Sequence, residues 1–273
     1  MLQDIAPHVF KNQFDQRRDP RPTDGVFVYH DGQLLVSDQQ AIPRVSDLAK
    51  WGGSTSQLTY LFTIDETAYY LTLESLAPTT TRQYQSVNAL RHSQPQALAF
   101  ASATAAHLGH WYASNQFCGR CGHRLTPGTT ERNLVCDHCG NQLFPTIAPA
   151  IIVGVTHGEQ LLLTKFLTGY DRYALLSGYV EIGETLADTV RREVHEEVGL
   201  GVHNIRYYGS QPWGASGSLL MGFFADLNQD VAIRLEKDEL AQAQWFDRTE
   251  LPHDDTTASL SWQMIEAFRH GNA

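Results

Sequence analysis

Apolar residues recur at every fourth position from Leu186 to Val198 in this 273-residue chain. That recurrence places them on one face of a helix, so the sequence predicts a helix with a single buried stripe. Thr185 precedes the run and is suited to cap its N-terminus, and Gly199 follows it as the expected C-terminal stop. Arginines and glutamates occupy the other faces of this predicted helix.

Strand-like patterns dominate the N-terminal third of the chain. Three apolar runs, over 25–29, 58–63 and 68–73, are separated by turns that contain proline and glycine. Such short runs rich in valine, tyrosine, phenylalanine and threonine are typical of β-strands. Residues 1–93 are therefore expected to form a β-rich domain of their own.

A helix and a second group of strands are predicted after this region. Apolar residues at helical spacing predict a helix from Pro95 to about Ala113, and two apolar runs predict a hairpin around His157-Gly158. The further elements expected are strands near 203–209, 218–226 and 243–247 and a terminal helix over roughly 256–270. Strands on both sides of a central helix, with a closing helix, predict an α/β sandwich.

The length of 273 residues fits about two globular domains. Hydrophobic residues make up 42% of the chain, and no apolar run approaches the length of a membrane span, so no membrane partner is expected. No secretory signal is apparent at the start, which favours a cytoplasmic location. The formal net charge of −10 argues mildly against tight binding of RNA phosphates.

A dense group of carboxylates coincides with the predicted central helix. Glu193, Glu196 and Glu197 project to one side of it, where like charges repel unless cations neutralise them. Gly178 and Gly183 are expected to bend the preceding loop, because neither carries a Cβ. Carboxylates at this density typically hold hard divalent cations against a phosphate.

The alternative is an ordinary solvated acidic face, which is the usual fate of an isolated glutamate pair. Arg192 and Glu184 accompany the glutamates here, which disfavours that alternative. We expect Arg192 to reach back to Glu184 or Glu181 and to pin the loop against the helix by a charge-assisted pair.

Four cysteines form two CxxC knuckles, Cys118–Cys121 and Cys136–Cys139. Four thiolates at this spacing can close a tetrahedral shell around one Zn²⁺ with no position left open, so the site is expected to be structural. Two disulfides, a redox pair and an iron–sulfur cluster are the alternatives. His123 and His138 lie beside the knuckles, but no ligand role is expected for them because four cysteines already fill the shell.

The carboxylate segment fits every fixed position of the Nudix box. In that box glycine, five residues, glutamate and seven residues precede Arg-Glu-aliphatic-x-Glu-Glu-x-Gly-aliphatic, and here it spans 178–200. With the zinc ribbon ahead of it and Ser210-Gln211-Pro212-Trp213 after it, the chain resembles the NADH pyrophosphatase (NAD⁺ diphosphatase) branch of the Nudix hydrolases. This resemblance runs from about residue 90 to the C-terminus.

The resemblance implies a fold class and an activity. The fold is α+β, with a β-rich N-terminal domain over 1–93, a linking helix and zinc ribbon over 94–145, and a C-terminal Nudix α/β/α sandwich with a mixed sheet over 146–273. The activity is metal-dependent hydrolysis of NAD(H) to nicotinamide mononucleotide and AMP. Removal of NAD caps from RNA 5′ ends and a homodimer are also implied.

Individual roles follow from the same resemblance. The metal ligands and catalytic residues are Glu193, Glu196 and above all Glu197, with Glu239 completing the metal site and Glu236 and Asp238 as its rivals. Phe144 and Tyr179 are placed to stack on a base, although ordinary packing is the alternative for each aromatic. The full set of expected substrate-binding residues is Phe144, Ser177, Tyr179, Gln211, Pro212, Trp213, Ser218, Ser261 and Arg91. For Arg91 an ordinary surface arginine is the alternative.

One loop departs from the branch. Relatives continue Ser-Gln-Pro-Trp with Pro-Phe-Pro, whereas this chain has Gly214-Ala215-Ser216. The loss of two prolines predicts a more flexible loop, and the lost phenylalanine removes a packing or stacking surface. Substrate preference is therefore the least constrained expectation. ADP-ribose or a dinucleoside polyphosphate is the alternative substrate, and a non-catalytic binder of nucleotide or nucleic acid is the alternative class.

Overall fold

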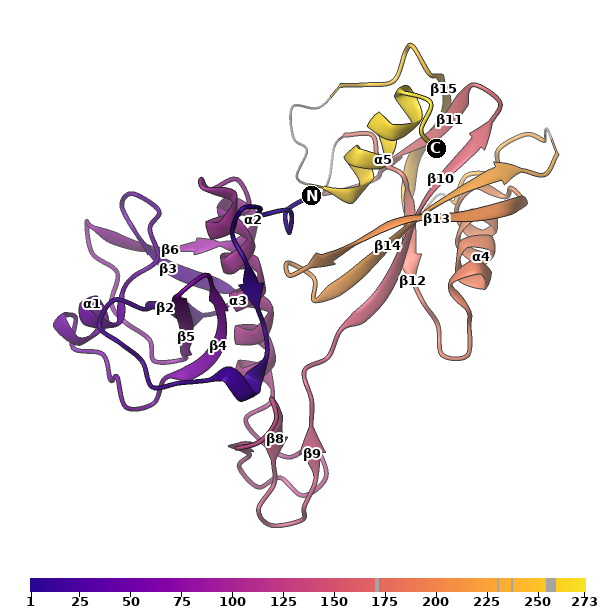
Figure 1. The fold of residues 1–273 in the computed structure, drawn as a ribbon. Coiled ribbons are helices and arrows are strands. Elements are labelled where there is room, and N and C mark those ends of the chain that lie inside the picture. The colour runs from indigo at the N-terminus through magenta and orange to yellow at the C-terminus, as the bar shows by residue number, and fades with distance from the viewer. Residues whose placement is uncertain (170–171, 230, 237, 254–258) are drawn as a thin grey trace. The chain divides into compact units, whose positions relative to one another are not determined.

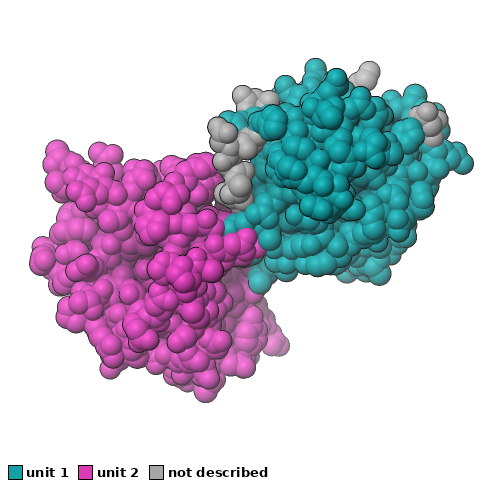
Figure 2. All heavy atoms as spheres, turned by 45° about the horizontal axis from the view of Figure 1, so that its top comes forward, with its two compact units in different colours: residues 1, 147–213, 218–273 teal, residues 2–146, 214–217 magenta. Residues whose placement is uncertain are grey.

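The computed structural model describes the chain except residues 170–171, 230, 237 and 254–258. It divides into two compact units, which Figure 2 distinguishes by colour. The N-terminal unit comprises residues 2–146 and 214–217, and the C-terminal unit comprises Met1, 147–213 and 218–273. The three-part division expected from the sequence stays a prediction. No helix of the described residues is long and apolar enough to cross a membrane.

The N-terminal unit contains a six-stranded sheet with strand order β1-β4-β5-β2-β3-β6 (Figure 1). Its strands are β1 (Phe10–Lys11), β2 (Gly25–His30), β3 (Gln33–Ser37), β4 (Thr59–Ile64), β5 (Thr67–Thr72) and β6 (Arg82–Ser86). The three strands expected from apolar runs are confirmed as β2, β4 and β5. Strand β6 has no comparable run, because it is largely polar and is defined by its antiparallel pairing with β3.

Helices and the ribbon complete this unit. The helices are η1 (Phe14–Gln16), α1 (Val45–Lys50), α2 (Val87–Leu90) and α3 (Gln96–Ser114), and the ribbon strands are β7 (Thr126–Pro127), β8 (Leu134–Val135) and β9 (Gln142–Leu143). Helix α3 confirms the helix expected from Pro95 to Ala113. Its alanine-rich surface shares one apolar cluster with the sheet and with Cys118 and Cys136. The ribbon is therefore built onto the same core as the N-terminal sheet.

The C-terminal unit is a mixed sheet with strand order β13-β14-β10-β11-β15 and with β12 paired to β10. Its strands are β10 (Ala148–His157), β11 (Gln160–Phe166), β12 (Leu176–Tyr179), β13 (Val202–Trp213), β14 (Ser218–Leu227) and β15 (Leu240–Asp247). Strand β10 runs parallel to β14 and antiparallel to β11 and β12, which confirms the mixed sheet and the expected hairpin.

Two helices cover opposite faces of that sheet (Figure 1). Ile151 and Val153 of β10 pack with α4 (Leu186–Val198), whereas the intervening Ile152 packs with α5 (Leu260–Arg269). This alternation follows from the two-residue period of a strand. The α/β/α sandwich is thereby confirmed. The terminal helix begins later than expected among the described residues, and positions 256–258 of that prediction lie outside them.

Candidate active site and zinc site

Helix α4 presents the candidate glutamates. Thr185 caps it, since its Oγ1 accepts a hydrogen bond from the Asp188 N–H at 3.2 Å. Gly199 ends the helix in the left-handed conformation, with φ 70°. Both expectations for the helix ends are confirmed. The apolar stripe from Val190 to Val198 is buried against the sheet, so the residues between its members face away from that core.

Strand β12 lies beside this helix and corrects one expectation. Gly178 was expected to bend a loop, but it lies within β12 and pairs with Ile151 of β10. A Cβ at position 178 would overlap the carboxyl group of Glu193. The glycine is therefore needed for close approach of a side chain rather than for a turn. Gly183, with φ 97°, does occupy the conformation that favours glycine.

Arg192 is the centre of the charge network. Its Nε and Nη2 donate to the two carboxylate oxygens of Glu184 at 2.6 and 3.0 Å, which confirms the expected pin. Its Nη1 also donates to Glu193 at 2.7 Å and to Glu196 at 2.9 Å. Its Nη2 donates to the Tyr179 carbonyl oxygen at 2.9 Å. The Arg192 guanidinium thus connects the loop that contains Glu184, helix α4 and β12.

Glu184 and Glu193 both bond to Arg192, but their pKa values are shifted in opposite directions. Hydrogen bonding from Arg192 lowers the pKa of Glu184 to about 2, with help from the Glu181 N–H and Thr189. Burial is the main cause that raises the pKa of Glu193, against the opposing effect of Arg192. Glu184 is therefore a structural anion, whereas Glu193 carries a charge that is not fully stabilised by the protein.

Glu197 is the least stabilised of these carboxyl groups. It is 4% exposed, and no donor within the described part of the chain reaches its Oε2. Burial, followed by repulsion from Glu193, Glu239 and Glu196, raises its pKa to about 8. A buried carboxylate surrounded by like charges and lacking a donor matches the requirements of a divalent-cation ligand.

Glu239 reaches this cluster from a distant part of the sequence. The Glu236 N–H donates to the Glu197 carbonyl oxygen at 2.8 Å, and the Arg234 N–H donates to that of Val198 at 2.9 Å. These bonds bring the segment before β15 to the end of α4. Glu239 acts on both Glu193 and Glu197, whereas neither of its rivals is among the charges that raise their pKa values.

The carboxylate oxygens of the described glutamates do not meet at a single point. Among the described residues, no three of these glutamates place carboxylate oxygens within 4.8 Å of one another. Arg192 Nη1 holds one oxygen of Glu193 and one of Glu196, so both carboxylates are engaged by the guanidinium. The glutamates therefore surround the buried carboxyl of Glu197 without closing on one point.

Several expected substrate-side residues meet at the ends of three strands. Ser177 and Tyr179 lie on β12, and Tyr179 is 53% exposed with its hydroxyl 3.4 Å from Ser218 Oγ at the start of β14. Pro212 and Trp213 end β13, where Trp213 pairs with Ser218. The C-terminal unit thus places the exposed Tyr179 ring beside Ser218, where β12 ends and β14 begins.

Gln211 and Ser261 occupy more buried positions. The Oε1 of the fully buried Gln211 accepts from the Leu260 N–H at 2.7 Å, and Ser261 Oγ accepts from the Leu175 N–H at 3.5 Å. Gln211 therefore bonds to backbone at the start of α5, whereas Ser261, which lies in α5, bonds to backbone just before β12.

Phe144 and Arg91 belong to the N-terminal unit. Phe144 follows β9 and is 53% exposed. Arg91 follows α2, and its Nε donates to His92 Nε2 at 3.0 Å. The turn Gly214–Gly217, which contains the departure from the related branch, also clusters with this unit.

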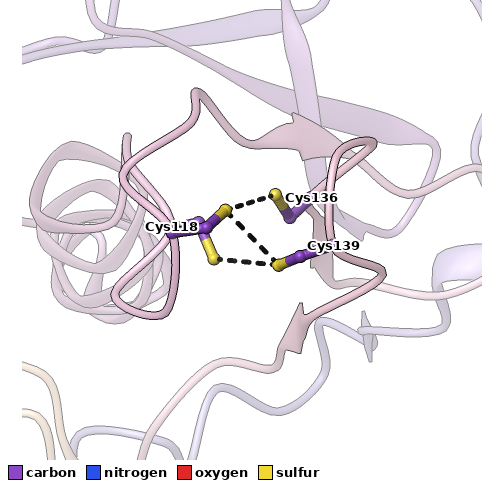
Figure 3. A group of neighbouring side chains, drawn as sticks. Cys118, Cys136 and Cys139 are labelled. Carbon is purple, nitrogen blue, oxygen red and sulfur yellow. Dashed lines mark hydrogen bonds between the residues drawn. The ribbon is translucent and has the colours of Figure 1, made fainter.

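The four cysteines are free thiols gathered in one place (Figure 3). The Sγ atom of Cys121 lies 3.4 Å from those of Cys136 and Cys139, and Cys118 Sγ lies 3.7 Å from Cys139 Sγ. Thiolates on Zn–S bonds of about 2.3 Å lie roughly 3.8 Å apart in a tetrahedron. The spacing therefore fits one Zn²⁺ held by all four.

Two residues of the site were predicted to pin the loop to the helix, but not to be ligands or substrate contacts. Glu184 and Arg192 organise the cluster, and their signal in the sequence is an eight-residue spacing within the box. Thr189 supports them by donating to Glu184 Oε2 at 2.9 Å. No sequence pattern indicated a role for Thr189, because that role depends on its burial beside Glu184.

Comparison with known proteins adds two family matches. Residues 145–268 match the NUDIX domain, and residues 113–144 match the NADH pyrophosphatase zinc ribbon domain.

Relatives from several bacteria are similar to more than half of the chain. A protein of Haemophilus influenzae strain PittGG, named NAD-capped RNA hydrolase NudC, is 37% identical over 191 residues, which is 68% of this chain and 72% of the relative. A protein of the same name from Enterobacter sp. strain 638 is 40% identical over 161 residues, covering 58% of this chain and 62% of the relative. A solved NUDIX hydrolase of Nitrosomonas europaea superposes with a TM-score of 0.49 at 22% identity, over 57% of this chain and 93% of that one.

Proposed function

This chain belongs to the Nudix hydrolase family, in the branch that carries the NADH pyrophosphatase zinc ribbon, and we propose that it hydrolyses the diphosphate bond of NAD(H). One water is consumed for each bond broken, and the products are nicotinamide mononucleotide and AMP. The observation that carries the proposal is the occurrence, in one chain, of this ribbon and a buried glutamate cluster centred on Glu197.

The glutamate cluster is the proposed site of a divalent cation, Mg²⁺ or Mn²⁺. Glu193, Glu196, Glu197 and Glu239 would hold it, and the unpartnered Oε2 of Glu197 supports this set. Such a cation supplies positive charge against the diphosphate and lowers the pKa of water. Zn²⁺ in the ribbon is proposed to be structural, because four cysteines leave no open coordination position.

Residues around the cluster are proposed to position the reacting groups. Arg192 holds Glu193 and Glu196 in place, and Gly178 leaves the space that the Glu193 carboxyl occupies. Glu197 is the catalytic residue that we place closest to the attacking water, because it is buried at the centre of the cluster and its Oε2 has no donor among the described residues.

Substrate recognition is proposed to use an exposed ring and neighbouring polar groups. Tyr179, with Ser177 and Ser218 beside it, would stack on a nicotinamide or adenine ring. Pro212 and Trp213 would line the same end of the sheet. Gln211 would act by positioning the start of α5, because it bonds to the Leu260 N–H. Ser261 would act by linking α5 to the backbone before β12, because it bonds to the Leu175 N–H. For Phe144 and Arg91, which belong to the N-terminal unit, substrate binding stays a prediction from the sequence.

NAD-capped RNA is the second substrate that we propose. It is favoured by the name NAD-capped RNA hydrolase of the relatives that are 37% and 40% identical. Chemically the bond is the same, because the cap joins the RNA through the diphosphate of NAD. A homodimer is proposed from the same branch, and sedimentation of the purified chain tests it. The cytoplasmic location stays a prediction from the sequence.

A substrate panel tests the proposed function. NADH, NAD⁺, ADP-ribose, a dinucleoside polyphosphate and NAD-capped RNA are incubated with the purified chain and Mg²⁺ or Mn²⁺, and products are separated by chromatography. Glu197→Gln should reduce turnover at least a hundredfold while the fold is retained. The assignment to NAD fails if ADP-ribose is cut at least as fast as both NADH and the capped RNA. Unchanged turnover in the variant would refute the proposed site.

A further inference from the structure

Thr189 of α4 has a fully buried hydroxyl that faces the loop containing Glu184. Its Oγ1 lies 2.9 Å from Glu184 Oε2 and 3.1 Å from the Thr185 carbonyl oxygen. A threonine inside a helix commonly donates to the carbonyl oxygen four residues before it. The single hydroxyl proton is directed to the carboxylate here, because a hydrogen bond to a charged acceptor is the stronger of the two.

Glu184 receives one of its hydrogen bonds from this hydroxyl. Its Oε2 accepts from the Glu181 N–H at 3.1 Å, from Thr189 at 2.9 Å and from Arg192 Nη2 at 3.0 Å. Thr189 and Arg192 both lie on α4, but the threonine side chain is short and branched at Cβ, which restricts its rotamers. The Thr189 hydroxyl therefore defines where the carboxylate lies relative to the helix more tightly than the long arginine side chain does.

Arg192 connects Glu184 to two of the proposed metal ligands. Its Nε and Nη2 bond to Glu184, whereas its Nη1 donates to Glu193 at 2.7 Å and to Glu196 at 2.9 Å. The guanidinium is planar and rigid, so its orientation on Glu184 determines where Nη1 holds the other two carboxylates. Thr189 is thereby connected to these ligands through two intervening side chains.

We propose that Thr189 is a positioning residue that sets the affinity of the glutamate cluster for Mg²⁺ or Mn²⁺, a role that rests on the proposed cation site. Removal of the hydroxyl leaves Glu184 with one donor fewer and the Arg192 guanidinium less firmly oriented. Glu193 and Glu196 are then less well pre-organised, so cation binding must restrict more of their side-chain freedom. The box motif does not specify this residue, because position 189 is one of the seven variable positions after its first glutamate.

Two substitutions separate the hydroxyl from the methyl group of Thr189. Thr189→Val keeps the branched shape and loses the hydroxyl, whereas Thr189→Ser keeps the hydroxyl and loses the methyl group. Mn²⁺ binding to the full chain, with Zn²⁺ retained in the ribbon, is measured without substrate from the electron paramagnetic resonance signal of free Mn²⁺. Thr189→Val should raise the dissociation constant of Mn²⁺ about tenfold, and Thr189→Ser should leave it within about twofold of wild type.

Thr156→Val is the matched control. The buried Thr156 Oγ1 donates to Asp226 Oδ1 at 2.9 Å, and Asp226 accepts a further bond from Arg206 Nη1 at 2.9 Å. Threonine, carboxylate and arginine are thus arranged as they are at Thr189, but neither Asp226 nor Arg206 is among the charges that act on Glu197. The Mn²⁺ affinity of Thr156→Val should therefore equal that of wild type.

Urea denaturation without Mn²⁺ measures the stability of each variant, and the loss of affinity is expected in Thr189→Val whichever Thr189 variant is the less stable. Unchanged Mn²⁺ affinity in Thr189→Val would overturn the positioning role and leave the cation site in place. An equal loss in Thr189→Ser or in Thr156→Val would also overturn it, because the Thr189 hydroxyl is then not the specific cause. Absence of Mn²⁺ binding by wild type would overturn the cation site itself, and this role with it.

Discussion

Gly178 of β12 faces the carboxyl group of Glu193 on α4 so closely that a Cβ on residue 178 would overlap it. The space is defined on both sides, because β12 is fixed by its pairing with β10 and Glu193 is held by Arg192. The first glycine of the box is therefore coupled to a proposed metal ligand fifteen residues later.

Gly178→Ala should destabilise the protein and impair catalysis. The added Cβ must displace Glu193 or strain β12, which costs about 1–3 kcal/mol in a well-packed site. Urea denaturation measures the first effect, and kcat for NADH hydrolysis, expected to fall at least tenfold, measures the second. Gly209→Ala is the matched control, since the nearest atom to its Cβ would be 3.9 Å away.

A double variant separates the clash from other effects of alanine at position 178. Glu193→Ala removes the group that the new Cβ meets, so Gly178→Ala should cost less stability in that background than alone. Additive losses of unfolding free energy would contradict the direct contact. Activity is expected to stay low in the double variant, because a proposed ligand is missing.

Arg192→Lys should disturb the cluster although the charge is retained. Lysine is a compact point charge and cannot reproduce the forked contact with Glu184 while bonding Glu193 and Glu196. A loss of about 1–2 kcal/mol of stability is expected, together with a lower kcat. Arg191→Lys is the control, because Arg191 is exposed and pairs only with Asp188 among the described acidic residues. Equal effects of both changes would contradict the special role of Arg192.

The raised pKa of Glu197 predicts a pH dependence of stability before Mg²⁺ or Mn²⁺ is added. Its folded pKa of about 8 exceeds the usual value of 4.5, so the unfolded carboxyl ionises first as the pH rises. Wild type should therefore lose stability relative to Glu197→Gln between about pH 4.5 and 8, with the full difference above pH 8.

Melting temperatures of the two proteins from pH 5 to 9, with Zn²⁺ retained in the ribbon, measure this difference. The advantage of the glutamine variant should grow to several degrees at alkaline pH. Saturating Mg²⁺ should stabilise wild type and reverse the order, because the cation binds only the folded cluster. A pH-independent difference would show that Glu197 does not titrate in this range.

Removal of zinc from the ribbon should weaken the N-terminal unit. Cys118 and Cys136 are buried in the same apolar cluster as Trp111 and Phe27, so loss of the metal exposes part of that core. Treatment with a strong chelator should lower the melting temperature by roughly 10 °C. Zn²⁺ should restore it, whereas Mg²⁺ alone should not. Full recovery with Mg²⁺ would place the stabilising ion at the glutamates instead.

Tyr179 should contribute through its ring more than through its hydroxyl. Stacking on a base is worth roughly 1–3 kcal/mol, so Tyr179→Ala should raise KM about tenfold. Tyr179→Phe keeps the ring and loses only the 3.4 Å contact with Ser218, so its KM should stay within about twofold of wild type. A KM in the phenylalanine variant as high as that of the alanine variant would favour a role for the hydroxyl.

Local spacing was enough to predict the elements with a repeating pattern. The four-residue recurrence defined α4 and its caps, because the period of a helix is a property of the segment itself. The CxxC knuckles predicted the zinc site for a similar reason, since each pair of cysteines is held together by a short turn. The box motif identified Glu193, Glu196 and Glu197 in the same way.

Only the tertiary structure decided which distant segments meet these residues. Glu239 approaches Glu197 because the segment before β15 bonds to the end of α4, and Gly178 meets Glu193 because β12 pairs with β10. The stacking of His123 on His138 likewise depends on how two knuckles fold together. Burial and proximity arise from long-range packing. A pattern confined to neighbouring positions therefore indicates the proposed ligands but not the residues that surround them.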